Sequence, residues 1–597
     1  MKKCALKLEV ADVRKSVVIS TFLLFLIFLT FLPRVLSLSK HWSSDETKWL
    51  LRSRDFFSAL QSKQFEGTYV THHPGITTCW LGTVAIWYRY HRDSSFRNWL
   101  DSDKFISPET LASIRLPIAV MTGVLIFVAG FLIYRLFGGA TAGLGTLFLA
   151  IEPFLLSESR RAHTDALMSL FLFLSLLLWL CYLESESPRR RDLILSGICF
   201  TFACLTKSLA AGFILFLPIL FGWYIERGVS WVKLIWGALL WMMSATLTII
   251  LAWPYLWTIK FTPWNIPMFP ILFLGGSALL FWSSRKLSSQ ISPSLTRTEF
   301  LILGYSLLMI VLPVLYAVNT IVGGMYWALA EANWVPTLFL GDIRYNPGMF
   351  YFPVMWFVWS TPLTFPLIGT AIYIAWQQRH HAQKSFSIII VLGAFVLFYL
   401  IGLSLIEKKI SRYIVVFLPV VSLLTALGAV QAGHLFKRKR LRFLLILGVV
   451  VMQIVPILQL HPNYRTYHYP FLSKKWVVEN TSSITGAGLS LAADYLNALP
   501  NVEDLRVRLN LFTTDLAHYF VGNTAVRYLP QDNTGAFDYD VEHLYDRQIK
   551  GIPVDPPPRD GIQLYTWDPT QELSRELEHV VRLNGIDYVW IYRVLEQ

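Results

Sequence analysis

Apolar residues in this chain come in long runs, separated by short polar stretches that hold most of the charge. A helix rises about 1.5 Å per residue, so a run of about 20 apolar residues crosses a bilayer. Such runs, together with two shorter ones at 193–206 and 209–225, predict a polytopic α-helical membrane protein with roughly thirteen crossings. The longer runs lie near 17–37, 113–136, 138–157, 166–184, 232–257, 266–283, 300–318, 351–376, 386–406, 411–432 and 442–460.

Basic residues in the short loops predict the orientation. If the crossings alternate from a cytoplasmic N-terminus, the basic loops at 188–192, 377–384 and 434–442 all lie inside, as the positive-inside rule requires. The first apolar run is longer than the core of a cleaved signal peptide, so we expect a retained anchor. An odd number of crossings then places everything after about residue 461 outside the cytoplasm, in a protein of the plasma (inner) membrane.

Three segments remain outside the lipid on that far face: 38–112, 319–350 and 461–597. The first of them contains an apolar piece at 76–87. At about 18 Å this piece is too short to span the bilayer, so it predicts an interfacial or re-entrant helix.

The C-terminal segment has lower hydropathy and turn sequences such as "VDPPPRDG", which are typical of a soluble domain. Helical periodicity at 489–499 and strand patterns at 506–512 and 587–592 predict a small α/β domain. We therefore expect a transmembrane domain at 1–460 and an extracytoplasmic α/β domain at 461–597.

Composition supports this class of protein, since 54% of the 597 residues are hydrophobic. The formal net charge of +13 would suggest nucleic-acid binding in a soluble protein, but here the basic residues gather in loops that orient helices. We therefore expect no nucleic-acid partner. The five cysteines form no metal-binding or disulfide spacing.

Two adjacent carboxylates, Asp45 and Glu46, follow the first apolar run and should lie just above the outer lipid boundary. Taken alone, they are more often a solvated helix start, because Asp favours the first turn of a helix. Further polar groups on the same face change this interpretation, since charges at membrane depth are costly and usually mark substrate paths. These groups lie at 71–75, 157–165, 340–348 and 407–413 and at Lys207, the one charge between Asp192 and Glu226.

This set combines carboxylates, cations and histidines. A carboxylate can take a proton from an attacking hydroxyl group, and cations can hold a departing phosphate. That division suits transfer from a phosphate-activated donor, although for Lys408 or Arg160 alone snorkelling to the interface is an equal alternative. No Walker or Gly-rich nucleotide motif is present, so a donor on the outer face would carry its own lipid tail.

At these positions the chain resembles the protein O-mannosyltransferase and aminoarabinose transferase superfamily (glycosyltransferase family 39-like), whose members have the GT-C fold. The resemblance runs from about residue 40 to about 430, and its six motifs stand in the family's order. They are "DETKW", "THHPGITTCWLG", "RRAHTDALMSLFLFLSLL", "CLTKSLAAG", "FLGDIRYNPGMFYFPVMWFVWSTPLT" and "EKKISRYIVVFLPVVSLL".

The resemblance implies an inverting glycosyltransferase that moves a sugar from a polyprenyl-phosphate donor to a hydroxyl group of protein, lipid or glycan. By position, Asp45 is the expected general base with Glu46 beside it. The implied phosphate-binding residues are Lys207, Arg412, Lys409 and His73. The implied supporting residues are Asp165, His163, Arg161 and Tyr345. In this chain "HHPG" replaces the family's commoner His-Pro-Pro.

Two other classes remain open from the residues alone. A flippase or transporter of a lipid-linked sugar would also place charges at membrane depth, but we find no convincing internal repeat. A receptor-like protein would leave the charges merely solvated. We expect no obligatory metal or other cofactor, because no spacing such as HExxH is present.

Overall fold

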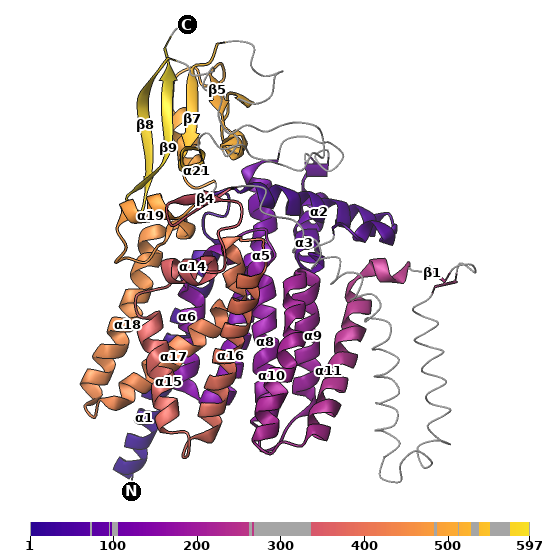
Figure 1. Cartoon of the computed structure of the whole chain (residues 1–597), viewed down its shortest axis with the longest axis vertical. Coiled ribbons are helices and arrows are strands. Elements are labelled where there is room, and N and C mark those ends of the chain that lie inside the picture. The colour runs from indigo at the N-terminus through magenta and orange to yellow at the C-terminus, as the bar shows by residue number, and fades with distance from the viewer. Residues whose placement is uncertain are drawn as a thin grey trace.

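The computed structural model describes eleven stretches of the chain, which are 2–71, 74–94, 96–97, 106–258, 260–261, 266–267, 336–482, 486–510, 513–526, 536–549 and 574–595. A bundle of long helices forms the body of the molecule, and a small sheet covers one end of it (Figure 1). The N-terminal end of the chain lies at the opposite end of the bundle from this sheet (Figure 1).

Helices of the bundle follow the predicted apolar runs. Their bounds are α1 (Lys2–Val35), α5 (Pro108–Phe137), α6 (Gly139–Ile151), α7 (Pro153–Ser159), α8 (Asp165–Leu183), α9 (Arg190–Thr206), α10 (Gly212–Glu226), α11 (Trp231–Ala252), α14 (Tyr351–Trp359), α15 (Thr364–Gln377), α16 (Gln383–Leu405), α17 (Leu418–Leu435) and α18 (Lys439–Leu460).

In the described part of the chain, 8 helices are long and apolar enough to cross a membrane, or up to 10 if each of two bent pairs counts as one crossing. This confirms a polytopic helical membrane protein. Every predicted crossing among the described residues coincides with a helix or a bent helix pair, but α9, the helix at the predicted crossing 193–206, has 17 residues and is not among those long enough to cross. The predicted crossings at 266–283 and 300–318 lie outside the described residues, as does most of the segment 319–350.

Three predicted crossings differ in detail from the structure. The run 138–157 is broken at Glu152 with a bend of 63°, and the run 351–376 is broken between α14 and α15 with a bend of 103°. Pro153 and Pro362 lie at these breaks, where the missing amide N–H and the ring end an α-helix. The run at 411–432 begins with a 3-10 turn, η4 (Ser411–Val416), before α17 starts.

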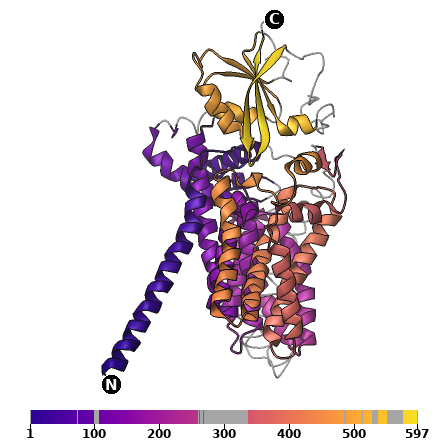
Figure 2. The ribbon, with the colours of Figure 1, turned by 90° about the vertical axis from the view of Figure 1, so that its left-hand side faces the viewer.

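The centre of the bundle is α8, all 19 residues of which are buried. A helix that is apolar on every side is expected in such a position, because it has no face to offer to water or lipid. By contrast, α1 is mostly exposed along its crossing, and Figure 2 shows it inclined away from the bundle. The first residues of α8 therefore lie in protein surroundings at the end of the bundle that the sheet covers.

The segment after α1 folds into shorter helices, α2 (Ser44–Gln61), η1 (Phe65–Thr68) and α3 (Ile76–Arg92). In Figure 1, α2 lies across the end of the bundle rather than along it. The predicted apolar piece at 76–87 is the first part of α3, which continues for one more polar turn. Gly75 precedes it at φ 59°, and a Cβ atom there would overlap the ring of Trp49, so this approach of α2 to α3 requires glycine.

The C-terminal region forms a five-stranded mixed sheet with the order β6-β5-β7-β9-β8. β5 pairs in parallel with β6 and β7, and β9 pairs antiparallel with β7 and β8. The bounds are α19 (Lys474–Asn480), α20 (Leu489–Asn497), β5 (Arg506–Leu509), β6 (Asn523–Val526), β7 (Tyr539–His543), α21 (Leu544–Gln548), β8 (Arg575–Leu583) and β9 (Ile586–Val594). The predicted α/β region, its helix at 489–499 and its two strands are confirmed.

This region packs onto the segment that leads into α2. Trp42 stacks on His518 with ring centroids 3.9 Å apart, and the Tyr519 hydroxyl donates to the Ser39 carbonyl at 3.1 Å. A short hairpin, β3 (Thr337–Phe339) and β4 (Asp342–Arg344), adds a second contact through a bridge between Phe339 and Thr481. The predicted division at 460/461 stays a prediction.

Candidate active site

Asp45 lies in the first turn of α2, where Ser43 in an extended conformation (φ −140°) starts the helix. Acidic residues favour this turn because the free backbone N–H groups carry partial positive charge. Asp45 remains 32% exposed, and its Oδ2 accepts a hydrogen bond of 2.7 Å from Arg412 Nη1. Residues 367 positions apart in the chain thus form one ion pair.

Asp165 is the second carboxylate on this arginine. It begins α8, is fully buried, and its Oδ2 lies 3.4 Å from Arg412 Nε. Its Oδ1 accepts a hydrogen bond of 2.6 Å from Lys207 Nζ, and His163 Nδ1 lies 2.8 Å from its Oδ2. Asp45, Arg412, Asp165 and Lys207 therefore form one continuous network at the covered end of the bundle.

Lys207 reaches this network because the chain breaks there between α9 and a 3-10 turn, η2 (Ser208–Ala211). Its backbone is extended (φ −158°), and its Nζ lies 4.2 Å from the centre of the Tyr413 ring. An ammonium group over an aromatic face gains a cation–π attraction that grows on desolvation. The ring of the residue after Arg412 thus helps to hold the lysine against Asp165.

Glu46, one residue after Asp45, points into different surroundings. It is fully buried, and Arg115 donates to both of its oxygens, from Nε at 2.7 Å and from Nη2 at 2.5 Å. The amide of Ala162 donates to Glu46 Oε1 at 2.8 Å. The same arginine donates to the His41 carbonyl at 2.8 Å, so it ties the start of α2 to α5.

A third group joins the polar loop at 158–165 to the chain after α18. Glu158 accepts from Arg161 at 3.2 Å and lies 3.3 Å from Arg465 Nε. Arg161 also lies 3.6 Å from Glu46 and donates to the Ser43 hydroxyl. Arg161 thus links the Glu46 and Glu158 groups.

Electrostatics distinguish the two acids of α2. Arg412 is the main cause that lowers the pKa of Asp45 far below its usual range, against the opposing effect of burial. For Glu46, burial alone would raise the pKa, but Arg115 and Arg161 lower it to about 2. Burial, and next Arg412, lower the pKa of His163, so its ring is neutral at pH 7. Because their pKa values are lowered, the carboxylates of Asp45 and Glu46 are both charged at neutral pH.

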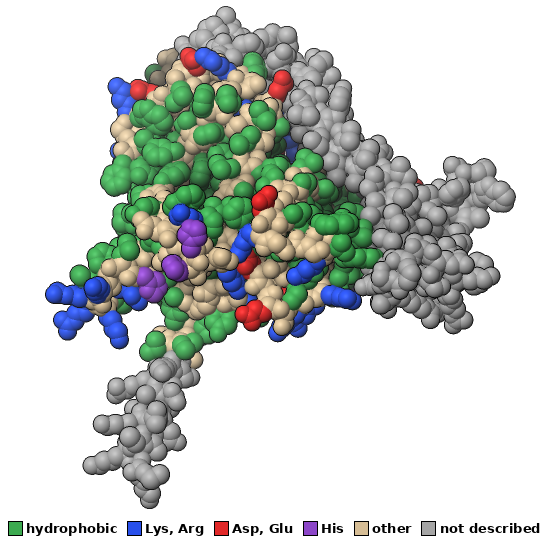
Figure 3. Space-filling view, turned by 60° about the horizontal axis from the view of Figure 1, so that its bottom comes forward, with side chains coloured by type: hydrophobic (Ala, Val, Ile, Leu, Met, Phe, Trp, Pro, Cys, Tyr) green, Lys and Arg blue, Asp and Glu red, His purple; other side chains and the backbone are tan. Residues whose placement is uncertain are grey.

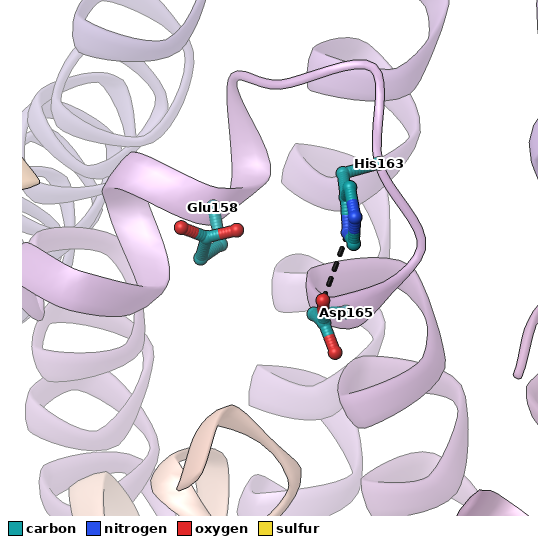
Figure 4. Close-up of side chains that lie close together, drawn as sticks. All are labelled: Glu158, His163 and Asp165. Carbon is teal, nitrogen blue, oxygen red and sulfur yellow. Dashed lines mark ion pairs between the residues drawn. The ribbon is translucent and has the colours of Figure 1, made fainter. Parts of the chain in front are cut away.

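Glu158, His163 and Asp165 are close enough to share a metal ion, since one ligand atom of each lies within 4.8 Å of the others (Figure 4). Both carboxylates already face cations, Glu158 facing Arg161 and Arg465. A divalent ion in this position would be repelled by guanidinium groups at short range. The donor set thus fits an ion by geometry but not by charge.

The structure brings together most of the predicted site residues: Asp45, Glu46, His163, Arg161, Asp165, Lys207 and Arg412. Lys409 instead donates to the carbonyls of Leu403 and Ser404, at 3.1 and 2.7 Å, and so holds the C-terminal end of α16. Tyr345 is half-buried in the loop after β4, and its role stays a prediction. His73 lies outside the described residues.

Three members of these groups were missed from the sequence: Arg115, Glu158 and Arg465. Arg115 stands alone at the start of an otherwise apolar run, and a lone charge at such a position is itself a signal for a buried partner. Glu158 lies within a polar stretch that was recognised only as a whole. Arg465 follows the last crossing, and no local pattern separates it from an ordinary loop residue.

Comparison with known families matches part of the chain. Residues 105–257 match the family model described as "Dolichyl-phosphate-mannose-protein mannosyltransferase". This segment contains Arg115, Glu158, Asp165 and Lys207, and the match supports the resemblance of this part of the chain to the superfamily. It supports glycosyl transfer as the general activity. None of the curated proteins matches the chain.

Among solved structures, the chain is similar to the archaeal oligosaccharyltransferase AglB from Archaeoglobus fulgidus, in complex with an inhibitory peptide and a dolichol-phosphate. The identity is 14%, the TM-score is 0.44, and the match covers 88% of this chain and 69% of that one. It is also similar to ArnT from Cupriavidus metallidurans bound to undecaprenyl phosphate, with 12% identity, a TM-score of 0.39, and coverage of 96% and 97%. Likenesses this distant do not assign a function.

Proposed function

We propose that this protein is an inverting glycosyltransferase that moves a monosaccharide from a polyprenyl-phosphate donor to a hydroxyl group of a protein, lipid or glycan. The observation that carries the proposal is the network of Asp45, Arg412, Asp165 and Lys207. It places a partly exposed carboxylate and two cations at one end of a membrane bundle, where a lipid-borne phosphate and a polar acceptor can meet.

Lys207 and Arg412 are the proposed ligands of the donor phosphate. The planar fork of an arginine suits two phosphate oxygens, and a lysine adds a point charge. When the bond between the anomeric carbon and the phosphate oxygen breaks, the electron pair leaves with the polyprenyl phosphate. Fixed cations that face this developing charge stabilise the transition state.

Asp45 is the proposed general base, and Arg412 controls its basicity. While Arg412 donates to Asp45, the carboxylate is a poor base because its pKa is held low. A donor phosphate that competes for Arg412 would weaken this pair and raise the basicity of Asp45. The carboxylate then takes the proton of the acceptor hydroxyl as its oxygen attacks the anomeric carbon from the face opposite the phosphate.

Glu46 is proposed as a positioning residue for Asp45. Its two hydrogen bonds to Arg115 hold the first turn of α2 against α5, so that Asp45 meets Arg412 at a fixed distance. A base held in place contributes more than its proton affinity alone, because the reacting groups need not be ordered during the reaction.

The proposed orientation places the site and the C-terminal α/β region on the non-cytoplasmic side of the plasma membrane. α8 and α17 begin near the site and run away from it to the loops that hold the exposed basic stretches 189–191 and 437–440. Figure 3 brings that far end of the bundle forward and shows Lys and Arg side chains around it. The positive-inside rule favours this end as the cytoplasmic one.

A flippase or transporter is the second candidate, and the broken helix pairs α6/α7 and α14/α15 favour it, because interrupted helices are common in transporters. Purified protein in liposomes, given labelled polyprenyl-phosphate mannose and serine-containing peptides or a lipid acceptor, separates the two. A labelled acceptor supports the transferase. Movement of the label between leaflets without product, in wild-type protein and Asp45→Asn alike, would contradict it.

A further inference from the structure

Two interrupted helices meet inside the membrane bundle, away from the network around Asp45. α6 and α7 are separated at Glu152 with a bend of 63°, and α14 and α15 are separated at 360–363 with a bend of 103°. A break in a helix frees backbone groups that lipid cannot satisfy, so it is tolerated where the protein encloses it or where it lines a polar cavity. The region between these breaks is therefore suited to a polar ligand.

A small cavity lies between the two breaks and is also lined by α17 and α18. Its lining includes the carboxylate residue Glu152, the amide residue Gln453 and the hydroxyl residues Thr361 and Ser422. Gln453 Nε2 donates to Thr361 Oγ1 at 2.6 Å, which links α18 to the second break. Polar side chains from four separate segments thus line one cavity.

Glu152 brings a charge to this cavity. Its Oε2 accepts a hydrogen bond of 2.5 Å from the amide of Leu155, and among the described residues it forms no ion pair with Lys, Arg or His. Glu152 is partly exposed and is the N-cap of α7, so this hydrogen bond and the helix end offset part of its charge. A proton or a cation would offset the rest.

Ser422 gives an independent indication of a ligand. It is only 4% exposed, it lines the cavity, and its Oγ has no hydrogen-bond partner among the described residues. The indole Nε1 of Trp356, which also lines the cavity, has none either. Buried polar atoms without partners are rare in proteins, and two at one cavity indicate that something polar occupies it.

We propose that this cavity binds a monovalent metal cation such as Na⁺, together with a water molecule. The ion takes oxygen ligands from Glu152, Ser422 and Thr361, and the water accepts the N–H of Trp356 while it coordinates the ion. One carboxylate balances one positive charge, whereas Ca²⁺ and Mg²⁺ favour several carboxylates or a retained water shell. The chemistry therefore selects a monovalent ion.

The ion would fix the angle between α6 and α7. α7 is only 7 residues long, and its last turn holds Glu158, the partner of Arg161 and Arg465. A ligand at the first break thus supports the helix that carries part of the proposed active site, without contacting the reacting groups.

The test is the melting temperature of purified full-length protein in NaCl, KCl and choline chloride at equal ionic strength. For wild-type protein we expect Tm to rise by about 2–4 °C, saturably, with Na⁺ or K⁺ relative to choline. Glu152→Gln, which removes the charge and keeps the shape, should abolish the rise. Glu226→Gln, the same change at an exposed helix end, should retain it.

Ser422→Ala and Thr361→Val keep the test decisive if Glu152→Gln does not fold, because each removes a neutral oxygen. We expect each to raise the cation concentration for half-maximal stabilisation by about tenfold, the loss of one good ligand. A wild-type Tm that is the same in all three salts contradicts the proposal, as does a full rise in Glu152→Gln. A Tm that follows pH but no cation shows that a proton neutralises Glu152 and overturns it too.

Discussion

Asp45 and Glu46 are neighbours in the first turn of α2, yet their carboxylates face different surroundings. Asp45 is 32% exposed and shares Arg412 with Asp165, whereas Glu46 is fully buried and receives two hydrogen bonds from Arg115. Successive residues of a helix point about 100° apart, so adjacent side chains face different surroundings. The two carboxylates therefore have separate roles: Asp45 is accessible to a ligand, and Glu46 is not.

The two arginines differ in the same way. Arg115 is 3% exposed and donates to backbone carbonyls as well as to Glu46, so its guanidinium group is fully engaged. Arg412 is 18% exposed and holds two carboxylates. A phosphate that enters near Arg412 can exchange with a carboxylate, while an entering anion cannot displace the contacts of Arg115 without unfolding the start of α2.

The largest expected effect is on turnover in Asp45→Asn. Without a base, transfer of labelled sugar from the polyprenyl-phosphate donor should fall about 10²–10⁴-fold. Donor binding should be retained or tightened, because Asp45 no longer competes with the phosphate for Arg412. Initial rates and equilibrium binding of the labelled donor measure the two quantities. The matched control is Asp55→Asn on the same helix, whose side chain is 58% exposed. Near-normal turnover in Asp45→Asn would show that another group takes the proton.

Glu46→Gln should affect stability before it affects chemistry. Removing one partner of a buried ion pair leaves Arg115 uncompensated, at a cost of about 3–5 kcal/mol in the free energy of unfolding. Thermal unfolding in detergent measures the loss, and Arg115→Met added to Glu46→Gln should recover part of it. A variant that unfolds like the wild type but transfers no sugar would move Glu46 into the chemistry and end the distinction drawn between the two acids.

The fold was largely predictable because lipid imposes a simple rule, that a crossing needs a long apolar helix. The breaks at Glu152 and at 360–363 were not predicted, since hydropathy runs through them without change. Strands β5 and β9 followed from the sequence pattern, but β6, β7 and β8 and the order of the sheet did not, because β5 pairs in parallel with β6 and β7 and β9 pairs antiparallel with β7 and β8. Pairing depends on contacts far apart in the chain.

For the site, the sequence predicted which motifs hold polar groups but not which of these groups contact one another. Asp45 and Glu46 look equivalent in "DETKW", and only the position of Arg115 on α5 separates them. Lys409 and Arg412 likewise share one motif, yet the turn η4 sends Lys409 to the end of α16. The direction of a side chain at a helix break is set by tertiary packing, which local patterns do not record.

Lys207→Gln tests whether the network of Lys207, Asp165, Arg412 and Asp45 binds the donor phosphate. Losing one charged hydrogen bond should weaken binding of the labelled donor about 10–100-fold, the equivalent of about 1.5–3 kcal/mol. Arg115→Lys should instead lower Tm and leave the donor affinity of the folded fraction unchanged. Titration of polyprenyl phosphate with each variant gives both results. Equal donor affinities in Lys207→Gln and wild type would remove Lys207 from the proposed phosphate site.

The stability of the protein at low pH offers a finer test of the buried ion pair between Glu46 and Arg115. The folded pKa of Glu46 is about 2, below its ordinary value of 4.5, so its contribution is fully present above pH 4.5 and is lost as the pH falls towards 2. Tm of the wild type should therefore decline below about pH 4.5, and Glu46→Gln should lack this part of the decline. Asp55→Asn should keep it. Parallel declines in wild type and Glu46→Gln would assign the acid sensitivity to other carboxylates.

The smallest expected effect is that of chelation. Glu158, His163 and Asp165 could hold an ion by distance, but Arg161, Arg412, Arg465 and Lys207 already neutralise the two carboxylates. A dication that entered would have to displace several ion pairs at once, against repulsion of about 8 kcal/mol per neighbouring unit charge at 4 Å and an effective dielectric of 20. EDTA should therefore change the transfer rate by less than about twofold, which is no more than a single weak ion pair contributes. A strong loss of the transfer rate on chelation would mean that a bound ion replaces these cations in the working enzyme. Mn²⁺ or Mg²⁺ should then restore the rate, and Asp165→Asn should show no such loss.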